Sequence, residues 1–103
     1  MIKNLPLGVE RAVRGYCEDY PRRKAEIAKG ALPPETIGHY MIINAGIDRA
    51  IASCCVDFFE EMREDIAGGL GYHNSKVAYI GYGTYKDRKR RCKLAIAKEL
   101  HLL

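Results

Sequence analysis

The sequence of 103 residues lacks the features that mark several common classes of protein. It contains no apolar run close to the roughly 18 residues that cross a bilayer, which excludes a membrane-spanning helix. Residues 1–8 have neither a basic region nor a long apolar core, so we expect no secretory signal and a cytoplasmic protein. Neither common type of glycine-rich phosphate loop is present. What remains is a small globular domain with no predicted membrane contact.

Cysteine and histidine occur, but without the spacing of a metal site or a catalytic pair. The four cysteines are Cys17, Cys54, Cys55 and Cys92. Structural zinc sites draw ligands from pairs about two to four residues apart, and no C-x-x-C motif is present. We therefore expect small, buried, hydrophobic cysteines in a reducing cytoplasm, with a redox or metal role as the alternative. No recognisable pair of catalytic groups occurs, so we predict that the protein is not an enzyme and uses no cofactor or metal.

Positive charge is concentrated in the last third of the chain. Residues 1–70 contain nine Lys or Arg and eleven Asp or Glu, a net charge of −2. Residues 71–103 contain eight Lys or Arg and only two acidic residues, a net charge of +6. The formal net charge of +4 hides this division, and the basic third is the part that points to a partner.

The first third of the chain predicts two helical segments and a turn. Apolar residues recur every three or four positions between about residues 7 and 28, which is the pattern of an amphipathic helix. Pro21 interrupts the pattern, so either a second helix opens at residues 19–20 or one helix kinks there. We expect residues 22–24 to form a solvated first turn and Gly30 to stop the helix.

A heptad pattern follows Pro34 and predicts one long helix, although Gly46 leaves its continuity open. After a one-residue shift the pattern continues to about Ala67, which gives a helix of about 45–50 Å, longer than a compact domain of this size is wide. Such a helix must project, be covered by the first helices, or pair with a second chain. Asn44 would fix the register of a homodimer, or it is a polar residue at an exposed end of an intramolecular hairpin. The seam residues are Ile37, Tyr40, Asn44, Ile47, Ile51 and Phe58.

A cluster of glycines after Ala67 ends this helix, and a second pattern begins. Residues 74–80 predict a short helix, with a strand as the rival interpretation. Residues 81–83 are typical of a three-residue turn, and Thr84 with Asp87 has the form of a capping box that opens a basic helix. A short helix, a turn and a capped basic helix together form the layout of a helix-turn-helix.

This layout suits DNA, because a recognition helix enters the major groove with its first residues against base edges while basic side chains hold phosphates. The predicted fold is all-α, with a long helical hairpin arm at residues 1–70 and a helix-turn-helix DNA-binding region at residues 71–103. The residues predicted to contact DNA are Ser75, Lys76, Tyr82, Thr84, Tyr85, Lys86, Arg88, Lys89, Arg90, Arg91 and Lys93.

Three alternatives stay open. The basic helix is, in the simplest alternative, only a solvated face of a helical bundle. A helical protein–protein adaptor that works through the seam of residues 37–58 is the main functional alternative, and retention on duplex DNA at low salt separates the two. A small terminase-like packaging protein also joins a helix-turn-helix to an oligomerising helix, and a ring-sized mass in light scattering would indicate it.

Several short stretches also carry a family resemblance. They are Asp19–Arg22, Arg63–Ile66, Gly71-Tyr72, Ser75, Ile80, Thr84-Tyr85, Arg88–Arg90 and Ile96–Leu100. They resemble small phage-encoded late-gene activators of the RinA and ArpU type, from prophages and mobile elements of Gram-positive bacteria, whose C-terminal half is similar to region four of sigma factors. The resemblance implies a bacterial cytoplasmic regulator that binds promoter DNA through residues 83–91, with RNA polymerase as a further partner. A short, glycine-flanked first helix and an unusually aromatic turn depart from sigma-type versions.

Overall fold

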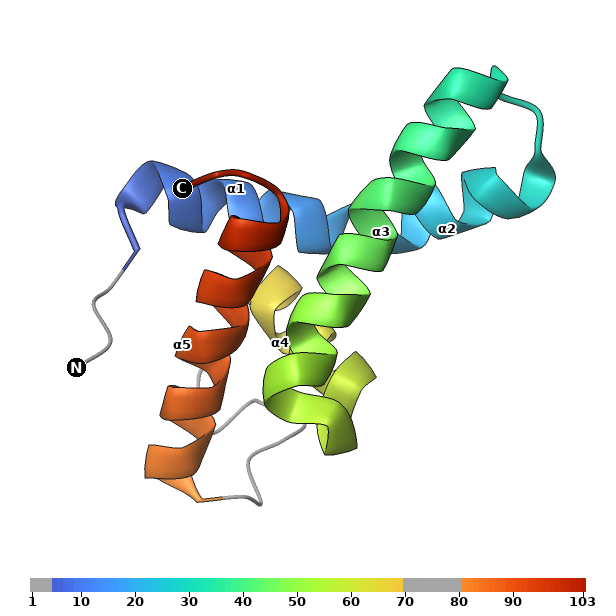
Figure 1. Cartoon of the computed structure of the whole chain (residues 1–103). Helices are drawn as coiled ribbons and strands as arrows, with labels where there is room; N and C mark the ends of the chain where they lie inside the picture. The colour runs from blue at the N-terminus through green and yellow to red at the C-terminus, as the bar shows by residue number, and fades with distance from the viewer. Residues whose placement is uncertain (1–4, 70–80) are drawn as a thin grey trace.

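The computed structural model describes residues 5–69 and 81–103, and every regular element in these two ranges is a helix (Figure 1). The elements are α1 (Leu7–Glu18), α2 (Tyr20–Lys29), α3 (Pro34–Cys55), the 3-10 helix η1 (Val56–Phe58), α4 (Phe59–Gly68) and α5 (Tyr82–Glu99). The predicted all-α class is confirmed. None of the described helices is both long enough and apolar enough to span a membrane. The short helix predicted at residues 74–80, with Ser75 and Lys76, lies outside the described residues.

Proline and glycine set the helix boundaries in the first half of the chain. α2 begins at Tyr20 with Pro21 in its first turn, so the chain forms two helices there and not one kinked helix. α2 ends at Gly30, whose φ of 66° lies in the left-handed region that favours glycine. α3 then begins at Pro34 and passes through Gly46 without a break. These boundaries follow the sequence pattern because each depends on local backbone chemistry.

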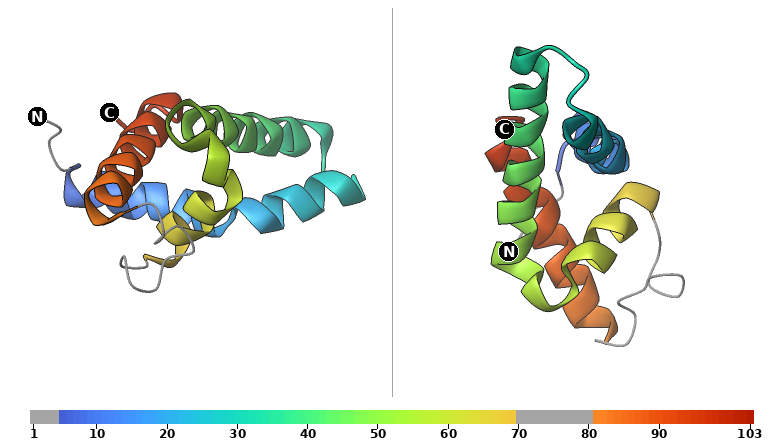
Figure 2. Two further views of the ribbon diagram at one scale, coloured as in Figure 1. Left: turned by 90° about the horizontal axis from the view of Figure 1, so that it is seen from below. Right: turned by 90° about the vertical axis from the view of Figure 1, so that its right-hand side faces the viewer.

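The prediction of a single helix from Pro34 to about Ala67 is wrong, because α3 ends at Cys55. Cys55 and Phe58 both leave the helical conformation, and η1 lies between them. A straight helix over this range would be about 50 Å long, whereas the longest dimension of the molecule is 43 Å. The break lets α4 turn back from the end of α3 (Figure 2) and pack against α1 and α3. The one-residue shift in the apolar pattern therefore marks this reversal.

One hydrophobic core joins the five helices. Its fully or almost fully buried members include Val13, Cys17, Ile47, Ile51, Met62, Ile66, Tyr85, Cys92 and Ile96. Each fully buried aliphatic side chain contributes about 1.5–3 kcal/mol to stability. α5 packs against α1, α3 and α4, so residues on both sides of position 70 share this core. The predicted division at residue 70 therefore does not separate two hydrophobic cores.

The predicted oligomer seam packs inside the chain. Ile47 and Ile51 are fully buried and Asn44 is buried, while Ile37, Tyr40 and Phe58 are half-buried. α2, α4 and α5 cover this side of α3, so the centre of the seam offers no surface to a second copy. The assignment of Asn44, Ile47 and Ile51 to a dimer interface is corrected accordingly, because these three side chains pack within one chain, whereas Ile37, Tyr40 and Phe58 stay partly exposed. The pattern is the same in both cases, because intramolecular and intermolecular helix packing bury the same kind of stripe.

Candidate nucleic-acid interface

α5 begins earlier than the sequence pattern predicts. Gly81 has a φ of 86° and directly precedes the helix, and its carbonyl accepts a 2.9 Å hydrogen bond from the backbone N–H of Tyr85. Tyr82 and Gly83 are therefore helical, so the predicted three-residue turn and the Thr84 capping box are wrong. Gly81 permits this early start because its positive φ costs glycine little. The consequence is a basic helix of 18 residues, about 27 Å long.

One face of α5 is directed into the protein. The side chain of Tyr85 is 3% exposed, and its hydroxyl donates a 2.6 Å hydrogen bond to the carboxylate of Asp65. The ammonium of Lys89 lies 2.7 Å from the same carboxylate, and the Lys89 side chain is 12% exposed. One turn further on, Lys93 pairs with Glu10 of α1 at 2.7 Å. Three residues predicted to contact DNA therefore attach α5 to α4 and α1.

Those three predictions are corrected for one physical reason. Tyr85, Lys89 and Lys93 are spaced four residues apart, which places them on the side of α5 that also carries the core residues Cys92 and Ile96. Lysine is long and keeps its charge at the edge of a core when a carboxylate is in reach, so a basic residue does not by itself mark an exposed face. The sequence shows the four-residue spacing, but it does not show that the carboxylates of Asp65 and Glu10 lie opposite these side chains in the fold.

The opposite side of α5 is basic, with four exposed residues and two, Arg90 and Leu94, that are half-buried. We call this the outer face, and it consists of Lys86, Asp87, Arg90, Arg91, Leu94 and Lys98. It carries four basic side chains and one carboxylate, Asp87, which lies 3.0 Å from Arg91 in an exposed pair. Exposed pairs of this kind contribute about 0–1 kcal/mol, so Arg91 can exchange its partner at little cost.

The first turn of α5 adds polar groups to the end of the outer face. Tyr82 is 57% exposed, and the ammonium of Lys86 lies 5.1 Å from the centre of its ring. Thr84 is also exposed. Arg88 differs from these residues, because it is half-buried and lies near the thiol of Cys55 on α3, where its charge opposes the rise in the pKa of that thiol that burial causes. Of the residues predicted to contact DNA within the described ranges, Tyr82, Thr84, Lys86 and Arg91 are exposed, and Arg90 is half-buried.

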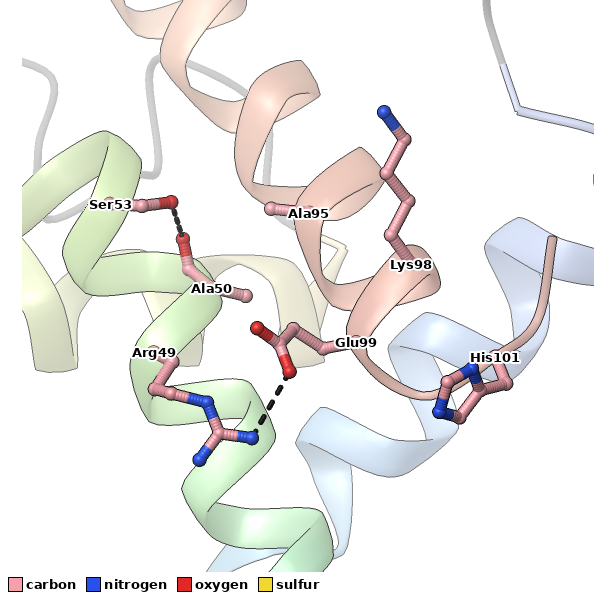
Figure 3. A pocket seen from close by; sticks show the side chains of 7 residues that line it. All are labelled: Arg49, Ala50, Ser53, Ala95, Lys98, Glu99 and His101. Atoms are coloured by element: carbon pink, nitrogen blue, oxygen red, sulfur yellow. Dashed lines mark hydrogen bonds and ion pairs between the residues drawn. The ribbon is translucent and has the colours of Figure 1, made fainter.

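A groove of about 440 Å³ lies between α3 and α5 beside the last turn of the outer face (Figure 3). Ala50 and Ala95 are among the residues that line it, and one side carries the ion pair of Arg49 with Glu99, at 3.1 Å. Lys98 extends away from this ion pair, as Figure 3 shows. Lys98 is the one basic residue of the outer face that the sequence analysis missed, because it stands apart from the run at residues 86–93. Lys98 therefore belongs both to the outer face and to the lining of the groove.

Three of the four cysteines are buried, as the sequence predicted. Cys17, Cys55 and Cys92 are buried and Cys54 is half-buried. Burial raises the pKa of the Cys17 thiol to about 12, and burial together with the neighbouring thiols raises that of Cys92. Neutral buried thiols are poor nucleophiles and poor ligands. No group of three or more His, Cys, Asp or Glu in residues 5–69 and 81–103 is arranged to hold a metal ion.

No family model, curated protein or solved structure matches this chain. The resemblance to RinA- and ArpU-type activators therefore remains a prediction from short stretches of sequence. A function must be argued from the surface of α5 itself.

Proposed function

We propose that the protein is a sequence-specific DNA-binding regulator that docks the outer face of α5 in the major groove. The proposal is based on one observation: the basic residues of α5 lie on two different faces of the helix, and only one face is used in ion pairs with other helices. Lys89 and Lys93 pair with carboxylates of other helices, whereas Lys86, Arg90 and Lys98 make no ion pair within the described residues. Cations that the fold does not use are available for a polyanion. An origin in a prophage or mobile element, and a contact with RNA polymerase, rest on the family resemblance alone.

Electrostatic attraction would bring the outer face to the duplex, and the first turn of α5 would then read bases. Each phosphate that a Lys or Arg neutralises releases condensed counterions, which makes affinity fall as salt rises. In the first turn of α5, the hydroxyls of Tyr82 and Thr84 are able to hydrogen-bond base edges. Lys86 and Arg90 are therefore assigned to phosphate contacts, and Thr84 and Tyr82 to the base edges.

The test compares the variant K86Q/R90Q with the control K24Q/K29Q, which removes two exposed cations from α2 at the other end of the molecule. Binding to a random-sequence duplex is measured by fluorescence anisotropy over a series of salt concentrations. We expect the slope of log K against log salt to decrease by about 2 for K86Q/R90Q and to stay unchanged for the control. Equal slopes for the two variants would contradict the proposal, as would the absence of binding by the parent protein at low salt.

A second candidate function, a protein–protein adaptor, has one observation in its favour. Met41 and Ile42 are adjacent on α3 and are 53% and 68% exposed. Contiguous exposed apolar patches mark docking surfaces, whereas single exposed apolar residues are ordinary. Failure of the parent protein to bind duplex DNA or heparin at low salt would favour this candidate.

A further inference from the structure

A cleft of about 450 Å³ lies between α1, the end of α4 and α5, on the side of α5 away from the groove in Figure 3. Four basic side chains line it, against a single carboxylate, that of Glu10. The basic residues are Arg11 and Arg14 of α1 and Lys89 and Lys93 of α5. Neither arginine of α1 is marked by the sequence as a site residue, because residues 1–70 are acidic in total. We call this feature the α1 cleft.

The two lysines of the α1 cleft are held in place by the fold, and the two arginines are nearer to solvent. Lys89 is paired with Asp65, and Lys93 with Glu10. Arg11 is exposed and makes no ion pair within the described residues. Arg14 pairs with Glu18 at 2.9 Å, but both side chains are more than half exposed, so the pair contributes little and exchanges readily. The arginines are therefore the groups that an anion would reach first.

Arg14 is seated against the turn that ends α4. Its Nε donates a 3.3 Å hydrogen bond to the carbonyl of Ala67, and a Cβ atom placed on Gly69 would lie 2.9 Å from its Nη1. Gly69 has a φ of 63°, so the turn itself needs glycine. A guanidinium held in this way loses less side-chain freedom when it binds a ligand. Its planar fork of donors matches the oxygens of a phosphate.

The α1 cleft is continuous with the outer face of α5. Arg90 lies four residues after Lys86 and three before Lys93, and residues at these spacings are neighbours on a helix surface. A line of positive charge therefore leads from Lys86 over Arg90 to Lys93 at the cleft, where Arg11 and Arg14 continue it. On the opposite flank of α5, Arg49 is paired with Glu99 of α5 itself.

From these contacts we infer that the α1 cleft seats a phosphate of the DNA backbone that flanks the groove entered by α5, with Arg11 and Arg14 as its ligands. The inference rests on the proposed function and adds a second element, α1, to the interface. A phosphate contact beside the recognition helix positions the protein on the duplex and carries no sequence information.

The test uses R11Q/R14Q, with K24Q/K29Q as the control of equal charge. We expect R11Q/R14Q to lower the slope of log K against log salt by about 2, equally for random and preferred duplexes. R11Q alone removes an exposed side chain that has no ion pair within residues 5–69 and 81–103, and it should lower the slope by about 1, which keeps the test decisive if R14Q weakens folding. Hydroxyl-radical footprinting should then show loss of protection at the edge of the site and not at its centre.

A matched pair of glycine variants tests the seat of Arg14. Gly69→Ala and Gly30→Ala both place a Cβ at a residue with a φ near 65°, but only at Gly69 does it meet Arg14. We expect Gly69→Ala to lower the salt slope by about 1 and Gly30→Ala to leave it unchanged. If K86Q/R90Q lowers the slope but neither R11Q nor R11Q/R14Q does, the inference about α1 is wrong and the proposed function stands. If the parent protein binds no duplex, both fail.

A free phosphate ion could occupy the α1 cleft in place of a phosphate of the DNA backbone, because both present the same oxygens to Arg11 and Arg14. Inorganic phosphate titrated at constant ionic strength should compete for duplex binding only weakly, because a single phosphate lacks the line of contacts along α5. The inference is overturned if inorganic phosphate binds tightly, R11Q/R14Q abolishes that binding, and duplex binding is unaffected. The α1 cleft would then be a site for a small anion and not for the DNA backbone.

Discussion

The Nε atom of Arg23 on α2 donates a 2.7 Å hydrogen bond to the side-chain oxygen of Asn44 on α3, and both residues are buried. Arg23 also donates to the backbone carbonyl of Tyr16, and Asn44 donates to that of Tyr20 at 3.3 Å. The expectation of a solvated turn at residues 22–24 is therefore wrong for Arg23. Asn44 does set a register, but it is the register of α2 on α3 within one chain.

Replacement of Asn44 by leucine should destabilise the protein. Asn44→Leu removes the acceptor of a buried guanidinium, and the loss of a hydrogen bond to a charged group costs about 1.5–3 kcal/mol. Urea unfolding measures the change, and His39→Leu, at an exposed position of the same helix, is the control. Light scattering on the same variant should show an unchanged mass. If Asn44→Leu changes the mass in light scattering and leaves the free energy of unfolding unchanged, Asn44 is a dimer-interface residue and not a contact between α2 and α3.

The carboxylate of Asp65 should hold α5 to α4 through its buried partners. Its side chain is fully buried, and its second oxygen has no hydrogen-bond partner within the described residues. Asp65→Asn leaves the Lys89 ammonium without its counter-charge, which costs about 3–5 kcal/mol. The double variant D65N/K89M should lose less than the sum of the two single variants, since it removes the orphaned charge as well.

Urea unfolding of the two single variants and the double variant forms the cycle that measures this coupling. Asp87→Asn, which breaks the exposed pair with Arg91, is the control and should cost less than about 1 kcal/mol. Additive losses in the cycle would contradict the assignment of Asp65 and Lys89 as a coupled pair.

Stability should fall in alkaline solution because of the buried thiols. The pKa of Cys17 is raised from 9.0 to about 12 by burial. Above about pH 9 the unfolded chain releases this proton while the folded chain keeps it, so the free energy of unfolding decreases by up to about 1.4 kcal/mol per pH unit for this group. Tyr20, whose pKa is raised to about 12 by burial and by its hydrogen bond to Asp48, adds to the loss above pH 10.

Urea unfolding at several pH values between about 7 and 10.5 measures how the free energy of unfolding changes with pH, for the parent protein and for Cys17→Ala. The variant will be less stable at every pH because it leaves a cavity, but its free energy of unfolding should fall less steeply above about pH 9. Parallel pH profiles for the two proteins would show that the Cys17 thiol does not control the alkaline loss.

Much of the fold could be predicted because its boundaries are local. Gly30, Pro34 and the glycine at position 69 start or stop helices through their own backbone geometry, and each does so as the pattern indicated. At Pro21 the pattern left a second helix and one kinked helix open, and the structure has the second helix. The outer face of α5 was predictable in part, since its residues lie in the basic run. The burial of Tyr85 was not, because only the position of Asp65 across the fold decides it.

The sequence by itself determined that this protein is helical, where most of its helices begin and end, and that its positive charge is gathered in the last third. These properties follow from dihedral preferences, periodicity and composition, which act between near neighbours. Only the tertiary structure decided which cations of α5 face solvent and that the centre of the seam of α3 is buried within one chain. Both depend on contacts between distant residues, such as the pairing of Lys93 with Glu10 across 83 positions, whose partners no local pattern identifies.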